Sequence, residues 1–330
     1  MNCERTVLWM KIAILGPGAI GRLVGYWLAS GGHQVVMVCR RTEQAERLGR
    51  QGLTYVDAAG QEHNLQVEAV FEADDEKLAE IDGLIVTVKS YDTEAAAQQI
   101  AAWHASIPVL SLQNGLGNAE TLARYLAPKR ISLALTTHGA TAEGDTRVWH
   151  KGQGQTVVGD VERGSGAARW WTELLMTCGQ SALLSDDIFT EVWRKAMINI
   201  GINPFTALLD VRNGQLVQEP EVLRLMQATV QEAEQVARAQ GINLQGSFER
   251  VLEVCKNTAA NSSSMRQDLQ KGRRTEIDAM CGVIEEIAEK SGLQAPYNTF
   301  LKKMVKKCET KWIILSSLQL QGMFEEFQRN

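Results

Sequence analysis

The feature that most constrains the fold is an apolar strand that runs directly into a glycine-rich turn. Residues 11–15 read KIAIL and residues 16–21 read GPGAIG. A helical pattern follows from Ala19 to Ser30, and a second apolar segment runs from Gln34 to Cys39. Strand, glycine turn, helix and strand within about thirty residues predict the first βαβ unit of a dinucleotide-binding fold.

Each glycine of this turn has a distinct expected role. Gly16 permits the tight turn, Gly18 lets the backbone approach a pyrophosphate, and Gly21 lets the helix pack closely on the strand. The pyrophosphate is expected to lie against the free amide groups and the positive end of the helix dipole. The predicted cofactor contacts in this segment are Gly16, Pro17, Gly18, Ala19, Ile20 and Gly21.

The end of the second strand indicates which dinucleotide is bound. An NAD site places Asp or Glu there, to accept a hydrogen bond from the ribose 2′-hydroxyl. This chain has Arg40 and Arg41 instead, and guanidinium groups bind a 2′-phosphate through charge-assisted hydrogen bonds. The sequence therefore predicts NADPH. Without the glycine motif, the two arginines would be interpreted as a solvated pair at the start of a loop.

Composition excludes several other classes of protein. The net charge is −5 and no long basic run occurs among the 330 residues, so no nucleic-acid partner is expected. The apolar stretch at residues 312–320 is too short to span a membrane. The six cysteines form no CxxC pair or Cys/His cluster; they are Cys3, Cys39, Cys178, Cys255, Cys281 and Cys308. We therefore expect no metal site and a reducing, cytoplasmic location.

The first half of the chain alternates apolar runs with helical patterns, as in a parallel sheet. We expect a Rossmann-type α/β domain at residues 1–186. Its strands are predicted at Lys11–Leu15, Gln34–Cys39, Gly83–Val88, Val109–Gln113 and Ile131–Thr136, with helices at Asp92–Ala102 and Ala119–Leu126. Small edge strands of the same sheet are predicted at Thr54–Asp57 and Leu65–Val70, and a β-hairpin at Arg147–His150 and Gln155–Gly159.

From about Asp187 the pattern becomes helical, so we predict an all-α domain at residues 187–330, with the boundary between Leu184 and Asp187. Helices are expected at Glu191–Gly201, Pro220–Gln240, Phe248–Thr258 and Glu276–Lys290. The segment Trp312–Leu320 is expected to belong to a helix that packs on the body of the protein or on a second copy of the chain. A homodimer is therefore one of two alternatives.

Polar residues follow two strands of the predicted sheet. Lys89 comes after one strand and Asn114 after the next, and ligands in such sheets bind beyond the carboxyl ends of the strands. Each has a plain alternative, because Asn114 precedes a glycine and suits a turn, whereas Lys89 suits a solvated helix start.

In the second half, Lys195, Asn199 and Asn203 are spaced four residues apart and lie along one helix face. Polar groups in an otherwise apolar helix are costly to bury without partners. The alternative is that Lys195 extends to solvent and that Asn203, before Pro204, ends the helix. That alternative does not explain Asn199.

A second polar cluster covers residues 261–268 (NSSSMRQD) and 275–278 (TEID). The serines could simply start a helix with Asp268 at its surface, and Glu276 could be an early-helix carboxylate favoured by the helix dipole.

These segments together resemble the ketopantoate reductase (2-dehydropantoate 2-reductase) family. The resemblance runs from Lys11 to about Lys306, and its motifs in the second half are more specific than the glycine turn. They are GPGAIG, Val88-Lys89, Asn114-Gly115, EVWRK at 191–195 with Asn199 and Asn203-Pro204, Ser263-Ser264-Met265 with Gln267-Asp268, and TEID at 275–278.

The resemblance implies NADPH-dependent reduction of 2-dehydropantoate to (R)-pantoate in pantothenate biosynthesis. It makes Lys195 the general acid that protonates the developing alkoxide, and it places Glu276 against the substrate. The implied substrate contacts are Asn114, Asn199, Asn203, Asn261 and Ser264. The implied cofactor contacts beyond the glycine turn are Arg40 at the 2′-phosphate, Lys89, Asn114 and Glu276.

Two alternatives stay open. The chain could reduce another 2-oxo acid on the same scaffold, which a comparison of substrate analogues would decide. It could also be an NADPH-binding sensor without catalysis, which would need neither Lys195 nor Glu276.

Overall fold

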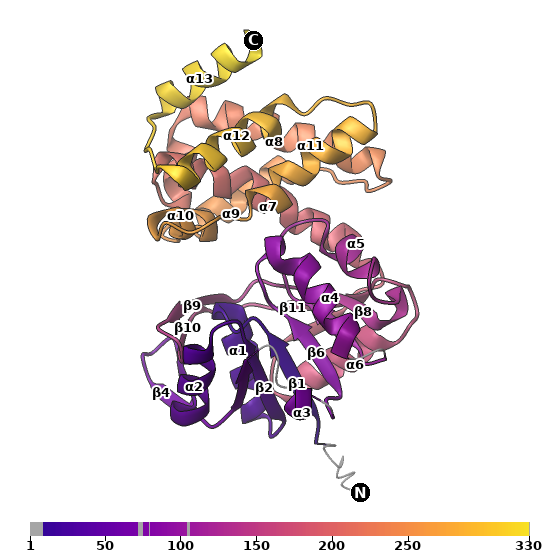
Figure 1. Cartoon of the computed structure of the whole chain (residues 1–330). Helices are drawn as coiled ribbons and strands as arrows, with labels where there is room; N and C mark the ends of the chain where they lie inside the picture. The colour runs from indigo at the N-terminus through magenta and orange to yellow at the C-terminus, as the bar shows by residue number, and fades with distance from the viewer. Residues whose placement is uncertain (1–8, 72–74, 79, 104–105, 330) are drawn as a thin grey trace, which may run out of the picture. The chain divides into compact units, whose positions relative to one another are not determined.

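A computed structural model describes residues 9–71, 75–78, 80–103 and 106–329. The chain forms two compact units (Figure 1). The first consists of Met1–Gln113 and Asn118–Ile188, and the second of Asn114–Gly117 and Phe189–Asn330. The short segment Asn114–Gly117 therefore groups with the second unit, although it lies far from it in the sequence.

The first unit contains an eight-stranded sheet in the order β12-β11-β8-β7-β6-β1-β2-β5. All neighbouring strands run parallel except β8 and β11. Ile12, Ala13 and Ile14 are fully buried, as expected for a parallel sheet covered on both faces. The strands are β1 (Lys11–Leu15), β2 (Gln34–Cys39), β5 (Glu68–Phe71), β6 (Gly83–Val86), β7 (Val109–Ser111), β8 (Ile131–Thr136), β11 (Thr156–Asp160) and β12 (Ala182–Leu184).

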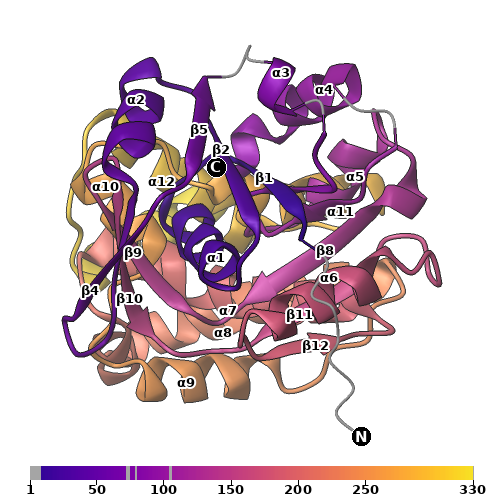
Figure 2. The ribbon, with the colours of Figure 1, turned by 90° about the horizontal axis from the view of Figure 1, so that it is seen from below.

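Helices cover this sheet, and α1 lies between it and a second sheet (Figure 2). Gly25 permits the close packing of α1 on β2, because a Cβ atom there would lie 2.1 Å from Cε of Met37. The helical segments of the unit are α1 (Ala19–Ser30), α2 (Thr42–Gln51), α3 (Asp75–Leu78), η1 (Ser90–Asp92), α4 (Thr93–Trp103), α5 (Asn118–Ala123), η2 (Pro128–Arg130) and α6 (Ala167–Thr177).

The second sheet has four strands in the order β4-β3-β10-β9 and overturns three sequence predictions. The predicted edge strand at Thr54 belongs to this sheet rather than to the large one. The edge strand predicted at Leu65–Val70 is divided between β4 and β5. No hairpin joins β10 to β11, because β10 pairs with β9 and β3 whereas β11 pairs with β8 and β12. The strands are β3 (Leu53–Val56), β4 (Glu62–Leu65), β9 (Gly139–Glu143) and β10 (Arg147–Gly152).

The second unit is helical in its described part, which confirms the predicted class. Its core is built from apolar side chains of most of these helices, among them the fully buried Phe205, Met226 and Val251. The helical segments are α7 (Ile188–Leu209), η3 (Asn213–Gln218), α8 (Pro220–Ala239), α9 (Ser247–Asn257), α10 (Ser264–Gln270), η4 (Ile277–Ala279), α11 (Cys281–Lys290), α12 (Pro296–Thr310) and α13 (Ser317–Arg329).

Three helix boundaries differ from the prediction. The helix α7 continues through Pro204 to Leu209, because Ile200, Phe205 and Leu208 on either side of the proline are fully buried in the core. The helix predicted from Glu276 begins only at Cys281. The terminal helix begins at Ser317, and Trp312 before it donates from Nε1 to the carbonyl of Ala207.

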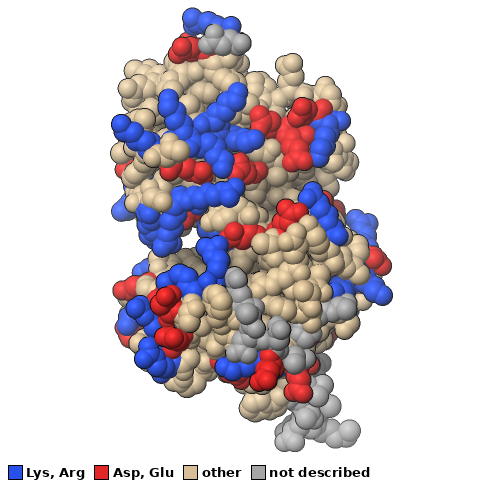
Figure 3. Space-filling model, in the orientation of Figure 1, with Lys and Arg blue, Asp and Glu red and all other residues tan. Residues whose placement is uncertain are grey.

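In the described part of the chain, no helix is long and apolar enough to cross a membrane. Five of the six cysteines are free thiols, and Cys3 lies outside the described residues. Basic and acidic side chains lie close to one another on the face of each unit shown in Figure 3.

Candidate active site

The glycine turn after β1 has the geometry that its sequence predicts. Gly16 has φ +85°, and a Cβ atom there would lie 2.5 Å from Cγ1 of Val88. A Cβ atom on Gly21 would lie 2.5 Å from Oγ1 of Thr87, so both positions require glycine. Gly18 is exposed, and a Cβ atom there would meet nothing closer than 3.9 Å. Internal packing therefore leaves Gly18 open to a ligand.

The start of α1 can bind an anion. The amide groups of Ala19, Ile20 and Gly21 precede the first helical hydrogen bond, in which Arg22 N donates to the carbonyl of Gly18 over 3.1 Å. No side chain caps this end, and the first turn holds no acidic residue. Free amides and the positive dipole end favour a phosphate group at this place.

The predicted 2′-phosphate residue lies at the end of β2. Nη1 of Arg40 is 2.9 Å from Oδ2 of Asp92, and 72% of the Arg40 side chain is exposed. Arg41 instead pairs with Asp145. Lys89 directly precedes η1, and its carbonyl accepts from Asp92 N. The ion pair between Arg40 and Asp92 therefore connects the segment that follows β2 with η1.

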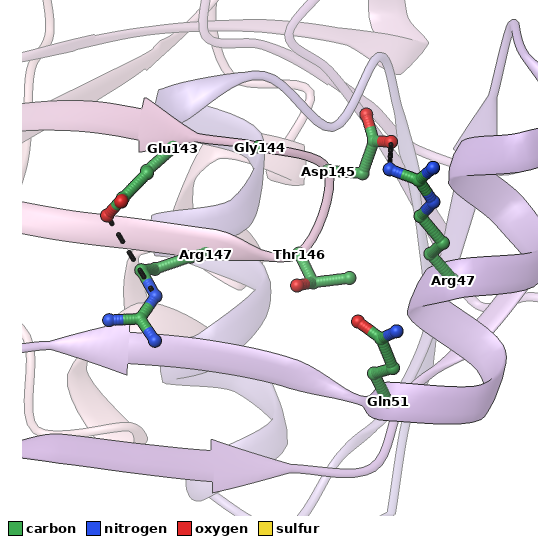
Figure 4. Close-up of a pocket in the computed structure, with 7 residues that line it drawn as sticks. All are labelled: Arg47, Gln51, Glu143, Gly144, Asp145, Thr146 and Arg147. Atoms are coloured by element: carbon green, nitrogen blue, oxygen red, sulfur yellow. Dashed lines mark hydrogen bonds and ion pairs between the residues drawn. The ribbon is translucent and has the colours of Figure 1, made fainter.

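A cavity of about 430 Å³ lies in the same unit, and none of the predicted cofactor residues lines it. Arg47 donates to Asp145, and Nε of Arg147 is 3.9 Å from a carboxylate oxygen of Glu143 (Figure 4). The charges at its wall thus neutralise one another. The lining residues are Arg47, Gln51, Glu143, Gly144, Asp145, Thr146 and Arg147.

In the second unit, α7 carries Lys195, Asn199 and Asn203 on successive turns. Lys195 and Asn199 are half-buried and Asn203 is buried. Desolvation lowers the pKa of Lys195 to about 8, and the negative charge of Glu276 partly opposes this decrease. An ammonium group with this pKa can donate a proton near neutral pH.

Glu276 is 5% exposed and lies in the turn before η4. The preceding residue, Thr275, is fully buried, and its amide and hydroxyl both donate to Oε1 of Glu309, over 2.8 and 2.6 Å. The amide of Ile277 donates to the Thr275 hydroxyl over 3.3 Å. The backbone on both sides of Glu276 is therefore anchored to α12, an arrangement that the sequence did not indicate.

The segment Asn114–Gly117 contacts the same turn. Leu116 N donates to the carbonyl of Ala279 over 2.8 Å. Gly115 has φ +89°, and a Cβ atom there would lie 2.6 Å from the same carbonyl oxygen. This close approach requires glycine, and it places Asn114 near the turn that carries Glu276.

The serine cluster is tied to α7. Ser263 caps α10 by accepting from Arg266 N over 3.1 Å, and its hydroxyl is 2.7 Å from Oγ1 of Thr206. Ser264, the first residue of α10, is exposed. Asn261 is also exposed, and its carbonyl accepts from Asn213 N. Sequence reasoning missed Thr206, because a threonine inside an apolar helix gives no signal of such a contact.

Family models of known proteins match both halves of the chain. The family model described as "Ketopantoate reductase PanE/ApbA" matches residues 12–163, and its C-terminal companion, "Ketopantoate reductase PanE/ApbA C terminal", matches residues 187–309. A 2-dehydropantoate 2-reductase of Halobacterium salinarum is 36% identical over 300 residues, which covers 90% of this chain and 98% of that protein.

Two solved structures have the same fold. A PanE/ApbA family ketopantoate reductase from Ralstonia eutropha superposes with a TM-score of 0.84 at 29% identity, covering 92% of this chain and 99% of that one. A D-mandelate dehydrogenase with NADH and anilino(oxo)acetate superposes with a TM-score of 0.86 at 27% identity, with the same coverage. The chain belongs to the ketopantoate reductase PanE/ApbA family.

Proposed function

We propose that this chain reduces 2-dehydropantoate to (R)-pantoate with NADPH. The observation that carries the proposal is the half-buried Lys195, whose pKa is lowered to about 8 beside the buried Glu276. The family membership and the relative named 2-dehydropantoate 2-reductase support the substrate.

The residues of the first unit suit a phosphorylated dinucleotide. The glycine turn and the free amides of α1 would hold the pyrophosphate, Arg40 would bind the 2′-phosphate, and Lys89 would contact the cofactor. Bound NADPH supplies the hydride. We propose that residues 1–186 form this cofactor domain and that residues 187–330 form a helical substrate and dimerisation domain.

The residues of the second unit would supply the proton and position the substrate. Hydride arriving at a ketone carbon leaves negative charge on its oxygen, and an ammonium group already in place stabilises that charge where it develops. Lys195 would donate its proton from Nζ to this oxygen. Glu276 would accept a hydrogen bond from the substrate, and Asn114, Asn199, Asn203, Asn261 and Ser264 would position the substrate.

The cofactor assignment is tested by Arg40→Asp. This change replaces the positive charge by a negative one, so NADPH binding should weaken by at least about tenfold, or about 1.4 kcal/mol, while NADH binding changes little. Titrations of both nucleotides, followed by nicotinamide fluorescence, measure this directly. The matched control is Arg41→Asp, because Arg41 already pairs with Asp145. Equal losses of NADPH and NADH binding in Arg40→Asp would reject the assignment.

A second candidate is reduction of another 2-oxo acid on the same scaffold. It is favoured by the structural likeness to a D-mandelate dehydrogenase with NADH and anilino(oxo)acetate. Turnover of ketopantoate, measured beside analogues that lack its 4-hydroxyl or its gem-dimethyl group, separates the two. Faster turnover of an analogue would move the assignment to the second candidate.

A further inference from the structure

Arg22 is an unusual residue of the cofactor unit, because it is a buried cation bonded to neutral groups. It lies on α1 directly after the glycine turn and is 4% exposed. Its Nε donates to the carbonyl of Pro17 over 2.9 Å, and its Nη1 donates to the carbonyl of Arg147 over 2.8 Å. Among the described residues, no carboxylate forms an ion pair with it.

This arrangement is costly without a compensating negative charge. Burial of a charged group that is not paired with an opposite charge is strongly unfavourable. Desolvation lowers the pKa of Arg22 to about 10, and the charge of Asp145 opposes this only in part. Arg22 therefore stays protonated at neutral pH. The carboxylate of Asp145 is itself paired with Arg41 and Arg47.

The carbonyl groups of the glycine turn explain what Arg22 does. The carbonyl of Gly16 accepts from Gly18 N and from the Thr87 hydroxyl, each over 2.7 Å. The carbonyl of Gly18 accepts from Arg22 N. The carbonyl of Pro17 accepts from Nε of Arg22 and, over 3.2 Å, from Nε2 of Gln44. Each carbonyl oxygen of the turn is thus occupied within the protein.

We infer that Arg22 is a positioning residue for the pyrophosphate of the cofactor, acting through the Pro17 carbonyl. An anion can approach the amides of α1 only if the carbonyl dipoles of the turn point away from it. Arg22 and Gln44 hold the Pro17 carbonyl in that orientation, and the buried charge of Arg22 adds attraction for the pyrophosphate. The inference rests on the proposed function.

The test compares two ligands of the same unit. NADPH contains the pyrophosphate, whereas 2′-AMP carries a 2′-phosphate and no pyrophosphate. Arg22→Met should raise the Kd for NADPH by about tenfold, or about 1.4 kcal/mol, and leave the Kd for 2′-AMP unchanged. Arg22→Lys keeps the charge but loses the guanidinium group that donates to both carbonyls. Its Kd for NADPH should therefore lie between those of Arg22→Met and the wild type. Titration calorimetry measures both ligands.

Arg130 offers a matched control. It is 8% exposed in the same unit, its Nε donates to the carbonyl of Ile107 over 2.8 Å, and desolvation lowers its pKa. Arg130→Met should lower the midpoint of thermal unfolding without changing the Kd for NADPH. If Arg22→Met does not fold, Gln44→Met tests the same carbonyl. It should raise the Kd for NADPH and leave the Kd for 2′-AMP unchanged.

The outcomes distinguish the inference from the proposed function. Unchanged NADPH binding in Arg22→Met, or equal losses of NADPH and 2′-AMP binding, would overturn the positioning role while leaving the reductase assignment intact. If the wild-type chain binds no NADPH, the proposed function fails and the inference fails with it.

Discussion

At the scale of single residues, the proposed chemistry depends on how Lys195 and Glu276 affect each other. Desolvation destabilises the ammonium form of Lys195, and the carboxylate of Glu276 stabilises it. The resulting pKa of about 8 lies close to neutral pH, where a general acid is most effective.

This balance predicts the pH dependence of ketopantoate reduction. Lys195 must be protonated to act as an acid, so kcat/KM should be constant below pH 8 and decline above it as the pKa of about 8 is passed. Glu276→Gln removes the charge that raises this pKa, so the decline should begin at lower pH. Stopped-flow measurement of NADPH oxidation between pH 6 and 10 gives the pH profiles of the wild type and of Glu276→Gln.

Lys195→Arg is the control, because a guanidinium stays protonated over this range. A decline near pH 8 that persists in Lys195→Arg would contradict the assignment.

At the scale of elements, α7 and α10 are joined beside Pro204. Proline has no N–H group, so a helix that continues through it lacks a backbone hydrogen bond. The Thr206 hydroxyl lies 3.0 Å from the carbonyls of Ile202 and Asn203 and 2.7 Å from the Ser263 hydroxyl. Ser263 Oγ also accepts from Arg266 N, so one continuous set of hydrogen bonds connects both helices.

Thr206→Val should therefore affect both stability and substrate use. It leaves the Ser263 hydroxyl without its buried partner, which costs about 1–3 kcal/mol in the free energy of unfolding. It also frees the start of α10, so the KM for the keto acid should rise. Urea denaturation and steady-state kinetics measure the two effects.

Thr229→Val is the control for this prediction. Thr229 is 1% exposed, and its hydroxyl donates to the carbonyl of Leu225 within α8. We expect a smaller loss of stability and an unchanged KM, whereas Thr206→Ser should keep wild-type values. A KM that rises equally in both valine variants would show that the contact with Ser263 has no role in binding.

At the scale of the whole molecule, the histidines are confined to one unit. All five precede residue 188, and His138 and His150 are buried in the first unit. Gly154 N donates to Nδ1 of His138, which lies 3.0 Å from Nε2 of His150, and Nδ1 of His150 lies 2.9 Å from the Tyr55 hydroxyl. Burial favours the neutral form of both rings.

Acid should therefore destabilise the first unit. Desolvation lowers the pKa of both histidines below the ordinary value of 6.5. These two histidines take up protons in the unfolded chain as the pH falls below 6.5 but resist protonation in the folded chain, so stability present at pH 7.5 is lost toward pH 5.5. Denaturation at both pH values measures the loss.

The loss should shrink in the double variant His138→Phe/His150→Phe. His63→Gln, on strand β4 of the same sheet, is the control and should keep the loss of the wild type. An equal loss of stability in the wild type and the double variant would contradict this explanation.

Local patterns in the sequence were sufficient for several elements. The glycine turn and the bounds of β1, α1 and β2 follow from residues close together in the chain, because apolar period and glycine geometry are local properties. The helical class of the second unit follows for the same reason. The spacing of Lys195, Asn199 and Asn203 likewise identified one face of α7.

Pairing between distant segments could not be predicted in this way. Strand patterns at Thr54 and Arg147 indicate strands but not their partners, so the assignment of β3 and β10 to a separate sheet depended on long-range contacts. The continuation of α7 through Pro204 depended on core packing, which outweighed the local preference of proline.

The sequence by itself determined the dinucleotide turn, the arginines at the end of β2 and the family. Only the tertiary structure decided that Arg22 is buried behind the turn, that Thr275 is anchored to Glu309, and that Gly115 contacts Ala279. The physical reason is that charge, hydroxyl and glycine are visible in a sequence, whereas burial and partners are properties of segments brought together by folding.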